Sequence, residues 1–582
     1  MQSVSFPFLL RLWQGSLLGV WGLGNTVLAQ QLPPGLPNNP PNPILPPPIE
    51  APDEEPLPPP NEILTPTAPQ SPITPLPEAP DQITVQGFRV MGSTVFSDAE
   101  LNEVTAPYTN RPITFTELLE ARSAITKLYV DRGYITSGAF IPAGQIIDNG
   151  IVTINVIEGS LEAIAVKGNK RLNSSYIRSR IRGAARPPLN VDRLLESLQL
   201  LQLDPLIGNL SAELSASSQP GLSLLEVTIT EADSFRVDVD LNNLRSPSIG
   251  SFQRQIQVEE LNVLGFGDAA RLAYANTDGS NQVNVGYTVP VNAKNGTVSI
   301  NFSQVWSKVV EAPFDVLNIT GVSRDLNVAY RQPIIRKPDQ EFALGLTVAR
   351  RESETFLQPE GFEKIRFPFA GSGSDENGRL RVTELRFSQD FTQRDRTTVF
   401  ALRSEFALGL NALGATNNAV APDGQFFLWR GQAQWVKRLA PDTLFLARSN
   451  VQFADRPLPS LAQFGLGGGD SVRGYRQDLL LVDNGIFGSA EVRIPILRVA
   501  RRKGILHLVP FLDVGHGWDL SPAIGGGDTS NTLFSGGIGL RWQWSDRLTA
   551  RLDWGIPFLD VGTQESGFNN SRVFFSITAT PF

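Results

Sequence analysis

The chain has 582 residues, of which 19% are charged and 41% are hydrophobic, and its formal net charge is −8. This length predicts about four modules rather than one domain, and the negative charge argues against a nucleic-acid partner. There is no cysteine and there are only two histidines, which excludes disulfides and thiolate metal sites and disfavours a histidine-rich metal centre. A Gly-Lys-Ser/Thr phosphate loop is absent too, so we expect no nucleotide, metal ion or other cofactor.

Residues 1–29 have the pattern of an export signal. Arg11 is their only charge, an apolar stretch runs over 17–28, and Val27-Leu28-Ala29 offers small or modest side chains for cleavage. An uncleaved membrane anchor is the alternative, although the apolar run is short and contains three glycines. No later stretch has 18 uninterrupted apolar residues, so we expect any further membrane crossing to be made by strands.

Residues 30–80 form a proline-rich linker. Twenty prolines fall within 31–80. Because proline lacks an amide hydrogen and fixes φ, neither helix nor sheet is expected to propagate there. We therefore expect an extended, semi-rigid tether, with a protein-binding role for its PxxP motifs as the alternative.

Two small units, 81–159 and 160–233, follow the linker and repeat one pattern. Gly92 and Gly168 end corresponding strands 76 residues apart, and the closing segments VTINVIEG and LEVTITEA align. Each unit is predicted as β-α-α-β-β, an α+β fold with the helices on one face of a three-stranded sheet. The exposed edge of such a sheet can accept an extended peptide as an added strand. The alternative is that both units are spacers.

Two helices are expected in each unit, and both helices of the first unit begin with a capping box. Ser97 with Glu100, and Thr114 with Glu117, have the spacing in which side chain and backbone cap each other at a helix start. The helices of the second unit are expected in SSYIRSRIRG and in NVDRLLESLQLLQL.

The C-terminal 349 residues, 234–582, contain no convincing long amphipathic helix and instead alternate apolar with small or polar residues. Examples are VNVGYTVPV (283–291), TVSINFSQV (297–305) and EFALGLTVA (341–349). The small, polar side of these runs has too little bulk for a water-soluble core, so we expect a closed membrane β-barrel with apolar side chains toward lipid. At about 22 residues for each strand and turn, the region holds ~16 antiparallel strands. A soluble array of β-sandwiches is the alternative.

Aromatic residues near the expected strand ends favour the barrel, since such rings anchor at membrane interfaces. The tryptophans concerned are Trp429, Trp435, Trp518, Trp542, Trp544 and Trp554. The terminal Phe582 is similar to the assembly signal of bacterial outer-membrane barrels. The alternating apolar set from Val573 to Ala579 is out of phase with it, so this similarity is partial.

The stretch GLGGGDSVRGYRQD is the most unusual local feature. One hypothesis takes its GDS as the nucleophile turn of a GDS-type esterase, with Asp513 and His516 completing a triad around Ser471. Such enzymes need an α/β domain with oxyanion donors around the serine, whereas this serine lies in a glycine loop among strands. The other hypothesis is a long loop that folds back and places Arg473 and Tyr475 in a confined space.

The order of the segments and three of their motifs resemble a known family. Signal, linker, two β-α-α-β-β units and barrel occur in this order in the TpsB outer-membrane transporters of two-partner secretion, the haemolysin secretion/activation type. Residues 131–159 are similar to the end of their first polypeptide-transport-associated (POTRA) domain. SVRGY (471–475) is similar to the tip of their sixth extracellular loop, and PFLDVGHGW (510–518) to the strand that meets the loop arginine. The resemblance covers about 500 residues, from 81 to the end.

The resemblance implies that the loop folds into the barrel lumen and that Arg473 pairs with Asp513. A carboxylate can bind a confined guanidinium through two hydrogen bonds, and glycines let the loop turn tightly and approach the wall. A surface turn with a solvated Arg473 is the alternative. The implied residues are Val472, Arg473, Gly474 and Tyr475 at the tip, Asp513 and Gly515 on the receiving strand, and Gly467, Gly468 and Gly469 for loop flexibility.

The resemblance also implies a location and a function. Its members lie in the bacterial outer membrane with their POTRA domains in the periplasm. They secrete a partner exoprotein, which the POTRA domains bind as an unfolded chain. The expected partners are therefore a secreted exoprotein and outer-membrane lipid, with no nucleotide, no nucleic acid and no enzymatic activity. An outer-membrane protein assembly factor of the same superfamily and a passive porin are the alternatives. Many members begin with a helix that plugs the pore, but QQLPPGLPNNPP at the start of the mature chain cannot form it.

Overall fold

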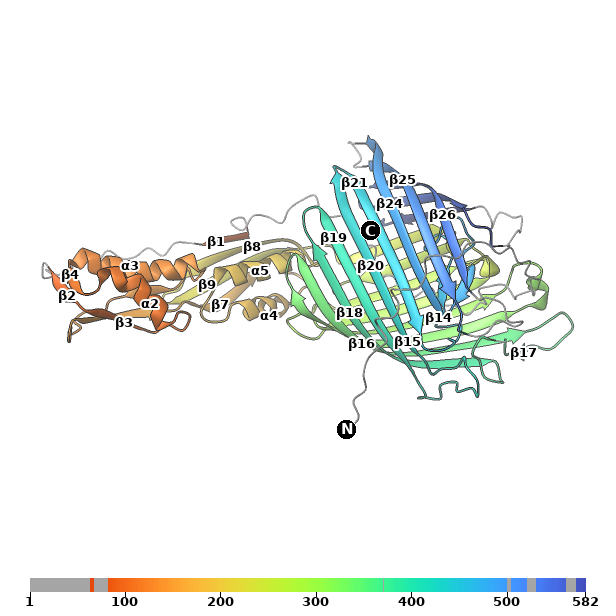
Figure 1. Ribbon diagram of the computed structural model, residues 1–582, viewed down its shortest axis with the longest axis horizontal. Helices are drawn as coiled ribbons and strands as arrows, with labels where there is room; N and C mark the ends of the chain where they lie inside the picture. Colours follow the sequence, from red (N-terminus) through yellow and green to blue (C-terminus); the bar gives the residue numbers. More distant parts are fainter. Residues whose placement is uncertain are drawn as a thin grey trace, which may run out of the picture. The chain divides into compact units, whose positions relative to one another are not determined.

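The computed structural model describes residues 63–66, 82–369, 371–499, 504–520, 530–561 and 572–581. The predicted signal, most of the linker, any plug at the start of the mature chain, and Phe582 lie outside these residues. The described chain comprises two small units that contain helices, and a large antiparallel barrel (Figure 1). Across the described ranges, no helix combines the length and the apolar character needed to span a bilayer.

The first unit is built on a sheet with the strand order β3-β6-β5. Strand β3 runs parallel to β6, and β5 runs antiparallel to it. The small β2–β4 pair is an addition to the predicted β-α-α-β-β order. The elements are β2 (Ile83–Val85), β3 (Gly87–Met91), α2 (Asp98–Thr105), η1 (Ala106–Tyr108), β4 (Arg111–Ile113), α3 (Phe115–Asp131), β5 (Gly138–Phe140) and β6 (Ile151–Ile157).

Both predicted capping boxes are confirmed. The Ser97 hydroxyl accepts from the Glu100 amide at 3.4 Å, while the Glu100 carboxylate accepts from the Ser97 amide at 2.9 Å. The corresponding distances for Thr114 and Glu117 are 3.2 and 2.8 Å. These caps start α2 and α3 where predicted because they satisfy amides that have no partner inside the helix.

The second unit repeats the arrangement and adds one strand from the linker. Its elements are β7 (Ser160–Lys167), α4 (Ser174–Ala184), α5 (Val191–Gln202), β8 (Ile207–Ala216) and β9 (Leu222–Glu231). The sheet order is β1-β8-β9-β7, where β1 is Leu64–Pro66. The expectation of a linker without sheet structure is wrong for these three residues, because Pro66 ends a proline-free run over 61–65 and lies on an edge strand, where its missing amide is tolerated.

The repeat extends to the turn that follows the first long strand of each unit. Gly92 and Gly168 have φ values of +86° and +83°, and a Cβ at either position would come within 2.5 Å or less of a backbone oxygen of the neighbouring strand. Glu158 and Glu231, near the end of each unit, accept hydrogen bonds from the amides that follow these glycines. Each turn is therefore closed by a carboxylate from the last part of its own unit.

The barrel is a closed antiparallel sheet of 16 long strands within the described chain. They are β10 (Phe235–Asn242), β11 (Gln253–Glu260), β12 (Ala269–Asn276), β13 (Ser280–Pro290), β14 (Thr297–Lys308), β15 (Thr320–Arg336), β16 (Gln340–Leu357), β18 (Arg379–Arg394), β19 (Thr398–Leu410), β20 (Phe427–Ala440), β21 (Thr443–Ala454), β24 (Asn484–Val499), β25 (Gly504–Trp518), β26 (Asn531–Trp544), β27 (Leu548–Pro557) and β28 (Val573–Ala579). The connections contain η2 (Pro247–Ile249), η3 (Phe314–Leu317) and β17 (Ile365–Arg366), which pairs with the end of β16.

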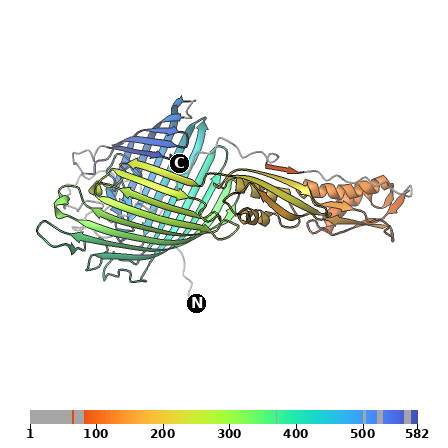
Figure 2. The same cartoon turned by 180° about the vertical axis from the view of Figure 1, so that it is seen from behind.

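The barrel closes between its first and last strands, where Val239 lies opposite Ala579 and Asn242 opposite Ser576. Figures 1 and 2 show the two sides of the wall. The predicted fold class, a membrane barrel preceded by two small α+β units, is confirmed. The strands range from 7 to 18 residues.

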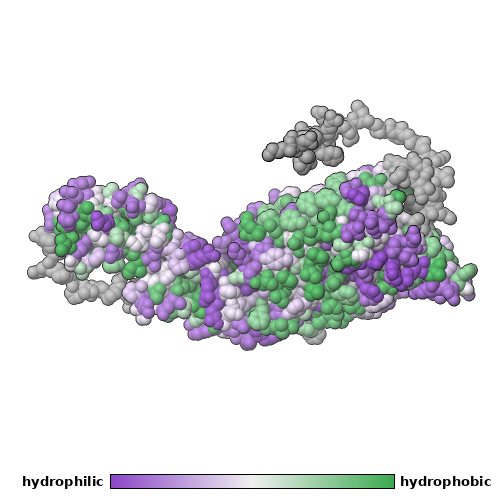
Figure 3. Space-filling model, turned by 90° about the horizontal axis from the view of Figure 1, so that it is seen from below, coloured by the Kyte–Doolittle hydropathy of each residue, from purple (hydrophilic) through white to green (hydrophobic). Residues whose placement is uncertain are grey.

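The apolar phase of the predicted strands faces outward. Val285, Ile300 and Leu346, from three of the strands predicted by alternation, are 47, 48 and 48% exposed. Hydrophobic side chains cover much of the outside of the barrel in Figure 3. Large apolar side chains at this exposure are stable next to lipid, which is the geometry of a transmembrane barrel.

A long connection, residues 455–483, joins β21 to β24, and we call it the central loop. It contains a short antiparallel pair, β22 (Phe464–Leu466) and β23 (Leu480–Val482). The residues between these two strands, 467–479, form the tip of the central loop.

Candidate functional site

The tip of the central loop is buried against the barrel wall. Val472 and Arg473 are 0% exposed, and Arg473 has the largest fully buried side chain of the described residues. A buried guanidinium is stable only when its charge and its donors find partners. Those partners come from the inward-facing side of β24, β25 and β27.

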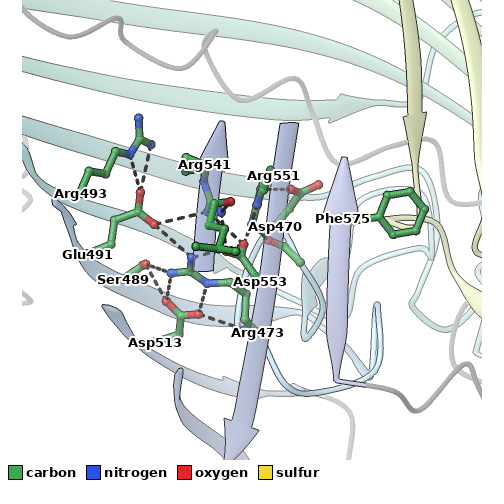
Figure 4. Close-up of polar contacts among 12 residues, drawn as sticks. Asp470, Arg473, Ser489, Glu491, Arg493, Asp513, Arg541, Arg551, Asp553 and Phe575 are labelled. Carbon is green, nitrogen blue, oxygen red and sulfur yellow. Dashed lines mark hydrogen bonds and ion pairs between the residues drawn. The ribbon is translucent and has the colours of Figure 1, made fainter. Parts of the chain in front are cut away.

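Asp513 on β25 is the main partner of Arg473 (Figure 4). Nε of Arg473 donates to Oδ2 at 2.7 Å and Nη2 donates to Oδ1 at 2.8 Å, which is a bidentate, charge-assisted pair. The backbone amide of Arg473 also donates to Oδ2 at 3.1 Å. Ser489 completes the group, since its hydroxyl donates to Asp513 at 2.6 Å and accepts from Arg473 at 3.1 Å.

Two further carboxylates surround the same guanidinium. Nη1 of Arg473 lies 3.0 Å from Oε2 of Glu491 and 3.6 Å from Oδ2 of Asp553. Both carboxylates also contact other guanidinium groups, those of Arg493, Arg541 and Arg551 (Figure 4). Because opposite charges alternate through the cluster, no member is buried alone. Removing one member of such a pair typically costs about 3–5 kcal/mol, since it leaves an uncompensated charge.

An aromatic ring adds a fifth partner to the Arg473 head group. Cζ of Arg473 lies 3.5 Å from the centroid of the Phe511 ring, a cation–π geometry. Sequence reasoning identified Asp513 but missed Ser489, Glu491, Phe511 and Asp553. All four lie on the inward phase of their strands, but charged side chains are common on that phase elsewhere in the barrel, as in the pairs Arg351–Asp325 and Arg403–Glu405, so no local signal marked them.

Glycines let the tip and the wall approach at the level of their backbones. Gly474 has a φ of +95°. A Cβ at Gly474 would lie 2.8 Å from the carbonyl carbon of Gly555 on β27, and a Cβ at Gly555 would lie 2.5 Å from the Gly474 nitrogen. A Cβ at Gly515 would lie 2.8 Å from the Val472 side chain. The predicted Gly474 and Gly515 therefore act together with Gly555, which the sequence did not reveal.

The three successive glycines of the tip have different roles. Gly467 and Gly468 have φ values of +102° and +98°, which ordinary side chains disfavour. Gly469 has no positive φ, but a Cβ there would lie 2.3 Å from the Leu244 side chain. The first two glycines therefore make the turn, and the third makes space.

The Tyr475 hydroxyl bridges two neighbouring strand ends. It donates toward the carbonyl oxygens of Leu559 and Phe534, at 2.8 and 3.0 Å, and lies 3.2 and 3.3 Å from the amides of Phe534 and Leu559. Its ring is 6% exposed and packs in a cluster with Val472 and Leu466. Tyr475 thus fastens the far side of the tip to β26 and the segment after β27.

The flanks of the central loop are held as well. On one flank, Arg430 of β20 donates to the carbonyl oxygen of Ala462 at 3.0 Å, and Arg351 of β16 donates to that of Leu461. Within the tip itself, Arg476 forms an ion pair with Glu311 in the connection after β14. The loop therefore contacts walls on several sides, with Arg473 at its most buried point.

The residues of the esterase hypothesis do not come together. Asp513 is 1% exposed and faces inward, whereas Leu512 and Val514 beside it are 55 and 46% exposed and face outward. His516 shares their outward phase, and its ring contacts Thr532. The Ser471 hydroxyl accepts from the amide of Gly467 at 2.8 Å. Among the described residues, no group of three or more His, Asp or Glu side chains is placed to hold a metal ion.

Comparison with known families identifies the chain. The model of the family described as haemolysin secretion/activation protein ShlB/FhaC/HecB matches residues 221–542, more than half of the chain. This chain belongs to that family. The model of the ShlB-type POTRA domain matches residues 83–159, which form the first unit.

Two relatives in the family carry transporter names. The outer membrane transporter CdiB of Escherichia coli is 23% identical over 434 residues, which are 71% of this chain and 70% of that protein. The heme/hemopexin transporter protein HuxB of Haemophilus influenzae (strain 86-028NP) is 22% identical over 409 residues, 66% of this chain and 67% of that protein.

Solved structures share the fold. CdiB from Escherichia coli superposes with a TM-score of 0.65 at 21% identity, covering 88% of this chain and 93% of that one. BamA from Haemophilus ducreyi lacking POTRA domains 1–3 gives 0.52 at 15% identity, covering 86% of this chain and 100% of that one. At these identities the likeness concerns the fold alone.

Family membership settles the class and the location of this member. It is an outer-membrane transporter of two-partner secretion, with its barrel in the outer membrane and its POTRA domains in the periplasm. Its family is one of transporters rather than enzymes.

Proposed function

We propose that this transporter binds its partner exoprotein as an unfolded chain in the periplasm and passes it through the barrel. In this proposal residues 81–159 and 160–233 are two POTRA domains that capture the substrate, and 234–582 form the translocating barrel. No nucleotide takes part, so folding of the exoprotein outside the cell would bias the direction of transport.

Capture by strand addition is supported by the sheets of the two POTRA domains. The first sheet ends in β3 and β5, and the second in β7 and in the β8 edge that carries β1. An edge strand presents unpaired amides and carbonyls that an extended chain can bind without any particular sequence. This mode of binding suits a substrate that is recognised before it has folded.

The proposed role of the central loop is to hold the inner wall in the form that permits transport. Residues at the tip contact β24, β25, β26 and β27 at once, through Arg473, Gly474 and Tyr475. A change in the position of the tip would therefore alter the packing of four neighbouring strands. The observation that carries this role is the fully buried Arg473 with its bidentate bond to Asp513.

Secretion in an Arg473→Ala variant tests the proposed function of the loop. The exoprotein is first identified as the protein that disappears from the medium when the transporter is deleted. We expect at least a tenfold loss of this protein from the medium in the variant, because about 3 kcal/mol or more of pairing energy is lost, while the amount of folded transporter in the outer membrane stays unchanged.

Arg456→Ala is the matched control. Arg456 lies in the same central loop, but its side chain is 48% exposed and its pair with Asp455 is at the surface, where such pairs contribute little. We expect normal secretion from this variant. Normal secretion from the Arg473→Ala variant would contradict the proposed role of the loop.

A further inference from the structure

A short strand of the linker occupies an edge of the second POTRA domain. Leu64, Thr65 and Pro66 of β1 pair in parallel with Ala212, Glu213 and Leu214 of β8, and Figure 1 shows β1 beside β8. On its other side β8 pairs with β9. The strand β1 therefore covers the edge that would otherwise be free for an added strand.

The contact is anchored by side chains as well as by the backbone. Ile63 and Leu64 are 1 and 4% exposed and belong to the hydrophobic core of the second POTRA domain. Residues opposite each other on neighbouring strands point to the same face. Leu64 lies opposite Ala212, which is itself buried, so the linker inserts apolar side chains at the rim of that core.

The pairing is short, and prolines on both sides keep it short. Pro58, Pro59 and Pro60 precede the segment, and Pro66 ends it. Since proline cannot donate to a ladder, β1 pairs with three residues of β8, although β8 runs over the ten residues Ile207–Ala216. A proline-free segment of eight or ten residues could form more ladder hydrogen bonds along the same edge.

We propose that Ile63–Pro66 is a built-in competitor that holds the β8 edge until an extended, proline-poor segment of the exoprotein displaces it. This inference rests on the proposed function, and it names the binding site and the chemistry of the segment that binds there. The segment carries adjacent apolar residues in place of Ile63 and Leu64, and it pairs with β8 over more than three residues. The linker strand thereby limits occupation of the edge to chains that pair over a longer stretch.

Competition within one chain has a measurable consequence. For a ligand that binds only the uncovered edge, the apparent affinity equals the intrinsic affinity multiplied by the fraction of molecules in which the edge is free. If β1 covers the edge in about nine molecules of ten, releasing it raises the apparent affinity about tenfold.

Binding of a labelled peptide to the full-length transporter in detergent micelles tests the proposal. The probe is a fluorescent peptide of linker residues 61–68 with Pro66→Val, and its binding is followed by anisotropy. The transporter variant Ile63→Asp/Leu64→Asp should bind it about tenfold more tightly than the unchanged transporter, because charged side chains cannot enter the core.

The linker supplies a matched control with the same dipeptide. Ile44-Leu45 also lies among prolines, and the Ile44→Asp/Leu45→Asp variant should bind the probe like the unchanged transporter. A probe that carries Ile63→Asp and Leu64→Asp should bind none of the three proteins. Equal affinity of the first probe for both transporter variants would overturn the proposal.

A crosslink tests the same site in the opposite direction, by holding β1 on the edge instead of releasing it. The chain has no cysteine, so the Leu64→Cys/Ala212→Cys variant can form one disulfide between β1 and β8. Oxidised, this protein should lose probe binding at least tenfold, and a reductant should restore it. Binding that is equal in the oxidised and reduced forms would overturn the proposal.

Measuring secretion with β1 crosslinked to β8 tests whether the exoprotein itself binds the β8 edge. Cells with the Leu64→Cys/Ala212→Cys variant should release at least tenfold less exoprotein than cells with either single cysteine, and normal release would show that the substrate does not use this edge. If the proposed function itself is wrong, deleting the transporter will remove no protein from the medium. This result is distinct from normal release by the crosslinked variant.

Discussion

Arg473 shows how one residue can decide the position of a loop. Three of its nitrogens bond to Asp513, and Nη1 bonds to Glu491. The family resemblance implies the pair with Asp513, but the other partners are scattered over three strands and have no local signature. They depend on the register of the barrel strands. Alternation in the sequence does not determine this register, because sliding one strand by two residues along its neighbour keeps the same side chains facing inward.

Gly555→Ala tests whether the backbone contact between tip and wall is required. A Cβ at this position would lie 2.5 Å from the Gly474 nitrogen and 2.6 Å from the Arg473 carbonyl carbon, so the tip must move. We expect a loss of secretion similar to that of Arg473→Ala, measured as exoprotein in the medium.

Gly488→Ala on β24 is the control for that substitution. The nearest atom to a Cβ at Gly488 is a Val514 side-chain carbon at 3.6 Å, an ordinary contact. This variant should secrete normally. A normal level of secretion from both alanine variants would show that the tip tolerates displacement from β27.

Among the elements, helices were predicted well and short strands poorly. The helices α2 and α3 carry capping boxes that can be recognised within four residues, and α4 and α5 begin at asparagine caps. By contrast, β1 lies among prolines and β4 contains Pro112, so neither has the usual composition of a strand. Both are edge strands whose existence depends on a neighbour that lies far away in the sequence.

The turn closed by Glu231 gives a test at the scale of one element. Burial opposes the ionisation of Glu231, but hydrogen bonds from the amides of Leu172, Lys170 and Arg171 lower its pKa below the ordinary value of a glutamate. Glu231→Gln removes the charge from these bonds and should weaken the turn by about 1–2 kcal/mol. Hydrogen exchange of amides 170–172 in the full-length protein should become about tenfold faster or more.

The same carboxylate predicts a pH dependence with a defined sign. Because the pKa is lower in the folded state, the stabilisation is fully present above the pKa of an unfolded glutamate, about 4.3, and is lost as the pH falls through the folded value. After correction for intrinsic exchange rates, amides 170–172 should therefore stay protected at pH 5–7 and lose protection only as the pH falls below the pKa of an unfolded glutamate. Unchanged protection at low pH would show that the turn does not depend on this charge.

At the scale of the whole molecule, the barrel could be predicted because alternation repeats along strand after strand. Val285, Ile300 and Leu346 each follow the same rule, and a closed sheet is the arrangement that leaves no edge in lipid. The path of the central loop could not be derived in the same way. Its contacts with β16 and with the connection after β14 join residues more than a hundred positions apart, and its contact with β20 joins residues 32 positions apart.

The position of the tip can be measured with single cysteines, because the chain contains none of its own. Val472→Cys reports on the tip, where the native side chain is 0% exposed. Val420→Cys reports on the connection between β19 and β20, at the same end of the barrel as the central loop, where the native side chain is 81% exposed.

Labelling intact cells with a membrane-impermeant maleimide is the most direct test of a loop pinned by Arg473. We expect rapid labelling of Val420→Cys, no labelling of Val472→Cys, and labelling of Val472→Cys once Arg473→Ala is added. Labelling of Val472→Cys at the rate of Val420→Cys, with Arg473 intact, would show that Arg473 does not hold the tip in its buried position.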